Sequence, residues 1–221
     1  MMRALTSAGA GMVAQQLNLD TIANNLANVN TNGFKAQRAE FQDMMYQTYR
    51  SSGAAGQGSQ SQPLSLQIGL GTQFSATSTN FAMGAFNQSS NPLDVAIAGD
   101  GFFRVQMPDG STAYTRDGSF KRDSEGNLVT SNGYKLSDEI KIDSGATEIT
   151  VMTDGTVNAK LPGADEATSV GTLKLAVFSN PAGLTRIGQN LFRAGGASGE
   201  PQEATPGEDG SGIIQSGVIE S

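Results

Sequence analysis

Four short segments of this sequence have residue types and spacings that chemistry could use. Asp123-Ser124-Glu125-Gly126-Asn127 is similar to half of a calcium-binding loop, but it lacks the spacing and the final bidentate glutamate of an EF-hand. Gly99-Asp100-Gly101 is glycine-rich, but the negative charge of Asp100 would repel a phosphate. A nucleotide-binding loop also leads into a helix, and no helical pattern follows this segment. Asp138-Glu139 and Asp165-Glu166 are adjacent pairs, which is typical of solvated loop charge rather than acid–base catalysis. We expect turns and surface loops at all four.

The composition removes the commonest catalytic partners. The chain has 221 residues and contains neither histidine nor cysteine, so the usual general base and the thiolate ligands are missing. Serines are present, but there is no Ser–His pair and no recognisable Ser–Lys motif. We therefore predict that the protein is not an enzyme and has no catalytic residues, cofactor or metal site.

The charge distribution excludes further classes of function. The net charge is −7, and residues 51–221 carry most of the acid, with 10 basic against 18 acidic side chains. A nucleic-acid-binding protein would show a clustered basic face, so that partner is disfavoured. The sequence has no apolar run long enough to span a bilayer, and no apolar segment with a cleavage site follows Arg3. We predict neither a transmembrane segment nor a cleavable signal peptide.

The sequence predicts a long helix at the N-terminus. Apolar residues recur at seven-residue spacing, as at positions a and d of a coiled coil, and predict an amphipathic helix from about residue 3 to about residue 28. Asn30-Thr31-Asn32-Gly33 then supplies a helix-ending turn. The stripe could cover the core of its own domain. We favour packing against helices of other molecules, because the helix is N-terminal and a segment of different composition begins at Phe34-Lys35. The expected interface residues are Leu5, Met12, Leu19, Ile22, Leu26 and Val29.

No charged residue occurs between Ser51 and Leu93. Such a stretch could be a disordered linker, or an extended hairpin buried between subunits, where unpaired charges would be costly. The alternation over 63–68 predicts a returning strand, so we expect an arm over 31–71 with a flexible tip at 51–62. The arm residues expected to face neighbouring subunits are Leu64, Leu66, Ile68 and Gly69.

Beyond Thr72, turn residues recur between short alternating runs, which is typical of an antiparallel β domain. Its clearest predicted strand is 173–178, stopped by Asn180-Pro181. The expected fold class is therefore α+β, with an amphipathic helix, an extended β arm and a mainly antiparallel β domain. The predicted parts are a helical assembly segment at 1–30, the arm at 31–71, the β domain at 72–212 and a segment at 213–221 that returns toward the arm.

The N-terminal segment resembles the signature of the bacterial flagellar rod and hook family. The matching residues are Asn24, Asn25, Leu26, Ala27, Asn28, Thr31, Gly33, Phe34 and Lys35. Further segments resemble the distal-rod branch of this family and cover most of the chain: 65–72, 94–103, 114–120 and 128–130. The stretch Leu66-Gln67-Ile68-Gly69 lies in a segment similar to the insertion that separates the distal rod from the hook protein.

The resemblance implies a structural subunit of the flagellar distal rod, a helical homopolymer that transmits torque from motor to hook through the periplasm. It implies axial contacts with proximal rod proteins and the hook protein, contacts with surrounding ring proteins, and delivery by the flagellar export apparatus without a cleavable signal. Family members normally carry a second amphipathic helix that pairs with the first, and this sequence stops at 217–221, where it would start. A proximal-rod or hook protein of the same family is the near alternative. A secreted β-rich binding module is the distant one, and the 6% of aromatic residues argues against it.

Overall fold

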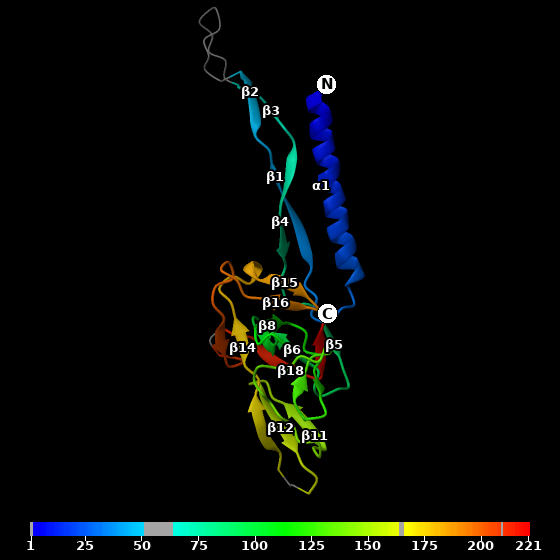
Figure 1. Cartoon of the computed structure of the whole chain (residues 1–221), viewed down its shortest axis with the longest axis vertical. Helices are drawn as coiled ribbons and strands as arrows, with labels where there is room; N and C mark the ends of the chain where they lie inside the picture. The colour runs from blue at the N-terminus through cyan, green and yellow to red at the C-terminus, as the bar shows by residue number, and fades with distance from the viewer. Residues whose placement is uncertain (1, 51–63, 164–165, 209) are drawn as a thin grey trace, which may run out of the picture. The chain divides into compact units, whose positions relative to one another are not determined.

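The structure is a computed structural model, shown in Figure 1, which describes residues 2–50, 64–163, 166–208 and 210–221. The expected tip at 51–62 lies outside the described residues. The chain forms two compact units, which we call the helix–arm unit and the β domain. The predicted α+β class is confirmed, because an N-terminal helix, an extended arm and mainly antiparallel strands are all present.

The helix–arm unit consists of the residues up to Ala27 together with 36–80, and the β domain consists of 28–35 together with 81–221. The chain therefore passes between the two units three times, after residues 27, 35 and 80. We call residues 28–35 the strap, because this segment belongs to the β domain and is continuous with the helix–arm unit at both of its ends.

The helix α1 spans Met2–Ala27, close to the predicted range. The amide of Thr31 donates to the carbonyl of Asn28 at 3.0 Å in the turn that follows. Gly33 has a φ of +65°, a left-handed conformation that glycine adopts without strain. Because α1 ends at Ala27, Val29 lies in the strap and not on the helix, where the periodicity had placed it.

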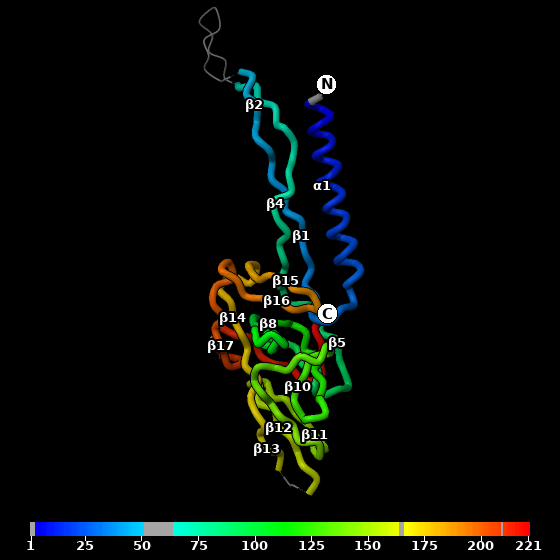
Figure 2. The backbone as a smooth tube through the Cα atoms, in the orientation of Figure 1, coloured from blue at the N-terminus to red at the C-terminus, as the bar shows by residue number. Residues whose placement is uncertain are grey.

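The arm is an antiparallel ribbon whose two strands can be followed side by side in Figure 2. Its base pairs β1 (Gln37–Asp43) with β4 (Thr72–Thr79), and its outer part pairs β2 (Tyr46–Arg50) with β3 (Leu66–Gly69). The ribbon therefore extends to residue 79, beyond the predicted limit at residue 71. The extra strand alternates side chains on two faces, and Phe74 in it packs edge-on against Phe41, with ring centroids 6.0 Å apart.

The helix packs on the arm through small side chains. Ala14 is buried, at 7% exposure, on the side of α1 that contacts the arm. Gly71 has a φ of +119°, and a Cβ there would lie 3.4 Å from both the Ala10 Cβ and the Ser7 Cα. At the start of α1, the Arg3 guanidinium donates to the Gln47 side chain at 2.6 Å. These contacts let the helix backbone approach the ribbon closely.

The β domain centres on a six-stranded antiparallel sheet with the order β15-β16-β8-β7-β14-β17. The strands are β7 (Phe102–Gln106), β8 (Thr112–Thr115), β14 (Leu175–Val177), β15 (Thr185–Gly188), β16 (Leu191–Arg193) and β17 (Gln202–Ala204). The predicted strand at 173–178 is shorter than expected, and the chain turns into a 3-10 helix, η1 (Pro181–Gly183), where proline cannot continue a ladder.

Smaller antiparallel sheets complete the domain. One contains β11 (Glu148–Val151), β12 (Thr156–Lys160) and β13 (Thr168–Thr172), and the others pair β5 (Phe86–Gln88) with β19 (Val218–Glu220), β6 (Val95–Ala98) with β18 (Ile213–Ser216), and β9 (Lys121–Arg122) with β10 (Leu128–Val129). The segment 213–221 pairs within the β domain, where Ile214 is fully buried in the main core cluster.

The core of the β domain is rich in edge-on aromatic contacts. Phe103 packs against Phe120 with ring centroids 5.0 Å apart, and Phe102 contacts both Phe81 and Phe192 at 5.3 and 5.9 Å. In the described part of the chain, no helix combines the length and the hydropathy needed to cross a bilayer.

Candidate functional site

The segments with possible chemistry are structural in the fold. The Asp123 carboxylate accepts from the amides of Glu125 and Asn127 at 2.9 and 2.8 Å, which closes a turn and uses the oxygens internally. Gly99 and Gly101 have φ values of +123° and +138°, as a turn between strands of different sheets requires.

One of the two carboxylate pairs differs from the expectation of solvated loop charge. The Asp138 side chain is 4% exposed and forms an ion pair with Arg104, and it also accepts from the Lys174 amide at 3.2 Å. Burial raises the pKa of Asp138 above its ordinary value, although Arg104 acts in the opposite direction. In the second pair, Asp165 lies outside the described residues.

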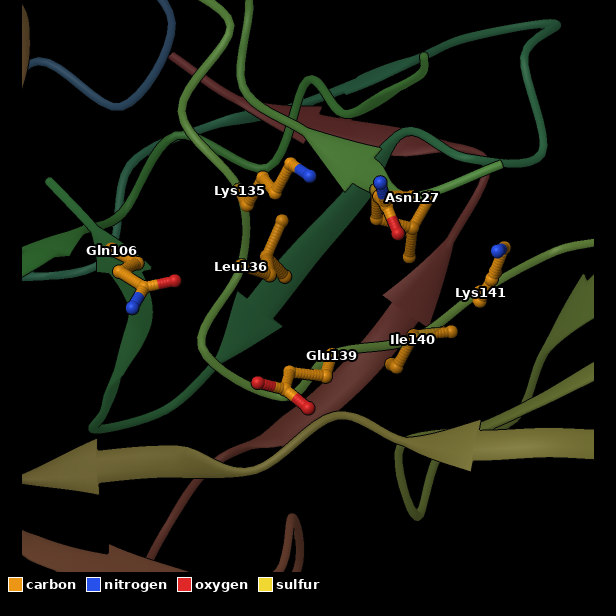
Figure 3. A pocket seen from close by; sticks show the side chains of 8 residues that line it. Gln106, Asn127, Lys135, Leu136, Glu139, Ile140 and Lys141 are labelled. Atoms are coloured by element: carbon orange, nitrogen blue, oxygen red, sulfur yellow. The ribbon is translucent and has the colours of Figure 1, made fainter. Parts of the chain in front are cut away.

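A cavity of about 350 Å³ lies beside this region, and Figure 3 shows its lining residues. Its polar lining comes from Gln106, Asn127, Lys135, Glu139 and Lys141. Glu139 is the single carboxylate among these residues, so the cavity does not offer the pair of acids that glycoside chemistry uses. Among the described residues, no three acidic, histidine or cysteine side chains gather where they could hold a metal ion.

The expected helix interface is exposed on the single chain. Its residues are Leu5, Met12, Leu19, Ile22, Leu26 and Val29, with exposed fractions of 71, 69, 64, 52, 71 and 60%. The side of α1 that contacts the arm is a different one, which contains Ala14. The stripe therefore does not cover a core of its own chain, and an exposed apolar surface of this kind is typical of a contact with another molecule.

The expected arm residues divide into two groups. Leu64, Leu66 and Ile68 are 76, 50 and 53% exposed, which leaves them available to another molecule. Gly69 instead faces its own chain, since a Cβ there would lie 3.3 Å from the Cε1 atom of Tyr46.

The signature residue Asn25 binds the base of the arm. Its Nδ2 donates to the Gln37 carbonyl at 2.7 Å, and the Gln37 amide donates to the Asn25 Oδ1 at 2.9 Å. The side-chain amide therefore occupies both backbone hydrogen-bonding groups of the first residue of β1, as a neighbouring strand would.

The signature residues from Asn28 onward lie in the strap, which is fastened to the β domain. The Gly33 amide donates to the Glu220 carbonyl at 2.9 Å, and a Cβ on Gly33 would lie 2.5 Å from the Asp117 nitrogen, so no other residue fits there. The Phe34 ring lies 5.2 Å from the Arg186 guanidinium, a cation–π distance. The same guanidinium donates to the carbonyl of Lys35.

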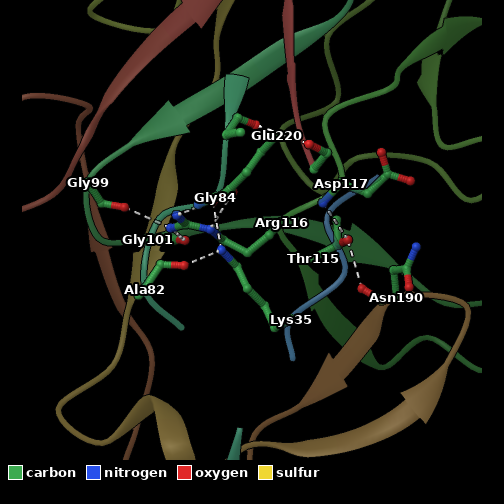
Figure 4. Close-up of polar contacts among 12 residues, drawn as sticks. Lys35, Ala82, Gly84, Gly99, Gly101, Thr115, Arg116, Asp117, Asn190 and Glu220 are labelled. Atoms are coloured by element: carbon green, nitrogen blue, oxygen red, sulfur yellow. Dashed lines mark hydrogen bonds and ion pairs between the residues drawn. The ribbon is translucent and has the colours of Figure 1, made fainter. Parts of the chain in front are cut away.

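Lys35, Arg116 and Glu220 form a buried ion cluster, shown in Figure 4. Their exposed fractions are 3, 3 and 2%. The Lys35 Nζ donates to Glu220 Oε1 at 2.6 Å, and Arg116 Nε donates to Glu220 Oε2 at 3.2 Å. Arg116 Nη2 also donates to Glu220 Oε1, at 3.5 Å. Other donors bind backbone carbonyls: Lys35 binds Ala82, and Arg116 binds Gly99 and Gly101, each at 2.8 Å.

Electrostatics in this cluster favour an ionised carboxylate. Burial alone would raise the pKa of Glu220, but Arg116, the Gly84 amide and Lys35 together hold it below its ordinary value. Burial, reinforced by the neighbouring Arg116, lowers the pKa of Lys35. The chemistry of the cluster is therefore structural, because every charged group in it is engaged by a protein partner.

Sequence reasoning did not find Glu220 or Arg186, and it included Arg116 only within a family motif. No local signal marked Glu220, since charged residues are mostly exposed and its partners lie far away in the sequence.

The chain matches two models of protein families. Residues 5–35 match the family of flagella basal body rod proteins, and residues 96–159 match the D1 domain of the flagellar hook proteins FlgE/F/G. The flagellar basal-body rod protein FlgG of Borreliella burgdorferi is 46% identical over all of this chain and 84% of its own length. The FlgG of Bacillus subtilis is 40% identical, also over all of this chain and 84% of its own length.

The chain belongs to the FlgG family of flagellar basal-body rod proteins. The hook alternative fits less well, because the hook protein FlgE of Helicobacter mustelae, at 41% identity, matches 65% of this chain and 32% of its own length. FlgG proteins are structural, so the protein is not an enzyme.

Proposed function

We propose that this protein is a structural subunit of the flagellar distal rod, which polymerises into a rigid tube and transmits torque from motor to hook. The observation that carries the proposal is the exposed apolar stripe of α1 in a member of the FlgG family. Its axial neighbours are further copies of itself, proximal rod proteins and the hook protein. Ring proteins surround the rod where it crosses the periplasm, and the flagellar export apparatus delivers the chain without a cleavable signal peptide.

In this proposal α1 packs against helices of neighbouring subunits. Burial of one leucine side chain stabilises a contact by roughly 1.5–3 kcal/mol, so the four apolar residues Leu5, Met12, Leu19 and Leu26 together supply a substantial part of each subunit contact. Because the small-residue side of α1 already contacts the arm, the stripe remains free for the neighbour.

The arm packs between subunits and limits their sliding. All residues of β2 are exposed, and so are Leu66 and Ile68 of β3. An isolated two-stranded ribbon is marginally stable in water, so contact with neighbours would stabilise the outer arm and stiffen the polymer at once.

Incorporation of a Leu19→Asp variant into rods tests the proposal. A carboxylate at a buried subunit contact costs several kcal/mol, so we expect incorporation to be abolished while the circular dichroism of the monomer is unchanged. Val13→Asp is the matched control, since Val13 is also an exposed apolar residue on α1 but lies on another side of the helix from the stripe. Equal incorporation of the two variants would contradict the assignment of the stripe as the subunit contact.

A further inference from the structure

Glu220 accepts hydrogen bonds both through its carboxylate and through its backbone carbonyl. Its Oε1 accepts from Lys35 Nζ at 2.6 Å and from the Gly84 amide at 2.8 Å, and its Oε2 accepts from Arg116. Its own carbonyl accepts from the Gly33 amide at 2.9 Å. This residue of β19 therefore binds the strap, Gly84 and Arg116, the residue that follows β8.

These contacts coincide with the places where the chain enters and leaves the β domain. The strap carries two of the three connections to the helix–arm unit, after residues 27 and 35, and the third enters at Phe81. Lys35 is the last residue before one connection, and its ammonium group also binds the carbonyl of Ala82, next to another. Glu220 thus fastens the segments on which all three connections end.

Arg116 holds the carboxylate in place. Its Nη1 donates to the carbonyls of Gly99 and Gly101 at 2.8 Å, which fixes the guanidinium to the turn between β6 and β7. Removal of one partner from a buried ion cluster leaves an uncompensated charge and is strongly unfavourable. The cluster is therefore a cooperative lock, in which each group depends on the other two.

We propose that Glu220 and Arg116 are positioning residues for rod assembly, which fasten the three chain connections to the β domain, although neither lies in the N-terminal signature. Force that passes through the backbone between the helix–arm unit and the β domain must pass through these connections. The ion cluster fixes the ends of these connections to the β domain, so that force on the connections reaches the β domain. This inference rests on the proposed rod function.

Amide hydrogen exchange in the full chain tests the lock directly. In Glu220→Gln, we expect exchange at Gly33 and Gly84 to rise at least tenfold, while Phe103, paired on both sides in the six-stranded sheet, changes less than twofold. Glu125→Gln is the matched control, because Glu125 forms an exposed ion pair with Lys135. Unchanged exchange at Gly33 and Gly84 would overturn the lock. If Glu220→Gln does not fold, Glu220→Asp keeps the charge but is one methylene shorter, and the same increase is expected at Gly84.

Rod incorporation of the same variants tests the functional part. We expect incorporation of Glu220→Gln to fall at least tenfold and that of Glu125→Gln to stay normal. Raised exchange with normal incorporation would overturn the positioning role. Failure of the proposed function itself is distinguishable, because the unmodified chain would then fail to enter rods, whatever the result at Glu220.

Discussion

The side-chain amide of Asn25 forms two hydrogen bonds with the backbone of Gln37, one through Nδ2 at 2.7 Å and one through Oδ1 at 2.9 Å. The last turns of α1 and the first residue of the arm are thereby joined through a single side chain. Asparagine suits this position because it presents a donor and an acceptor in one plane.

Asn25→Asp should loosen the base of the arm. Aspartate keeps the acceptor for the Gln37 amide but loses the donor for its carbonyl, so one bond of the pair disappears and the carboxylate faces an oxygen. We expect the helix–arm contact to weaken by about 1–3 kcal/mol. Amide exchange at the residues of β1 measures the change. Asn18→Asp on the same helix is the control, and an equal effect of both variants would contradict a special role for Asn25.

Ala14→Glu should separate α1 from the arm without unfolding the β domain. Ala14 is buried against the ribbon, so a glutamate there must either be desolvated or push the helix away. We expect at least tenfold faster amide exchange along α1 and unchanged exchange in the six-stranded sheet. Gln15→Glu introduces the same side chain at the next, exposed position. Comparable exchange in both variants would show that the small-residue side of α1 does not hold the helix.

The stability of the β domain should depend on pH through Glu220. Because the pKa of Glu220 is lower in the folded chain than in the unfolded one, its contribution is complete above the ordinary glutamate pKa and is lost as pH falls through the folded value. Each unit of depression corresponds to about 1.4 kcal/mol. Urea unfolding followed by circular dichroism between pH 2.5 and 6 measures the slope. Subtracting the unfolding free energies of Glu220→Gln from those of the wild type at each pH cancels the contribution of the other carboxylates. A difference that does not change with pH would refute the assignment to Glu220.

Shortening the arm should soften the rod without preventing its assembly. The amide of Leu70 donates to the carbonyl of Met45 at 3.3 Å, so the ribbon can be closed there by replacing residues 46–69 with Asn-Gly. This change leaves α1, β1 and β4 intact. We expect polymerisation to continue and the polymer to bend more easily, because the exposed apolar residues of the outer arm are gone. Curvature fluctuations in images of purified rods provide the measurement, and unchanged fluctuations would show that the outer arm is a passive extension.

The features predictable from the sequence were those encoded locally. The seven-residue period predicted α1 to within about a residue at each end, and the glycine and asparagine turns predicted an antiparallel β domain. The arm was predicted too short, since the alternation of 72–79 is equally typical of a domain strand and only its pairing with β1 assigns it. The ion cluster could not be predicted, because Lys35 and Glu220 are 185 residues apart and no local pattern links them.

That separation also has a consequence for the order in which the protein matures. The contact between Lys35 and Glu220 closes nearly the whole chain into one loop, and contacts of this range form late because the loop entropy must be overcome first. A chain that is made or threaded from its N-terminus exposes α1 and the strap long before residue 220 arrives. The contacts of Gly33 and Lys35 with Glu220 therefore form only after β19 has joined its sheet, and later than the contacts of the strap with Arg186 and Asn190 become possible.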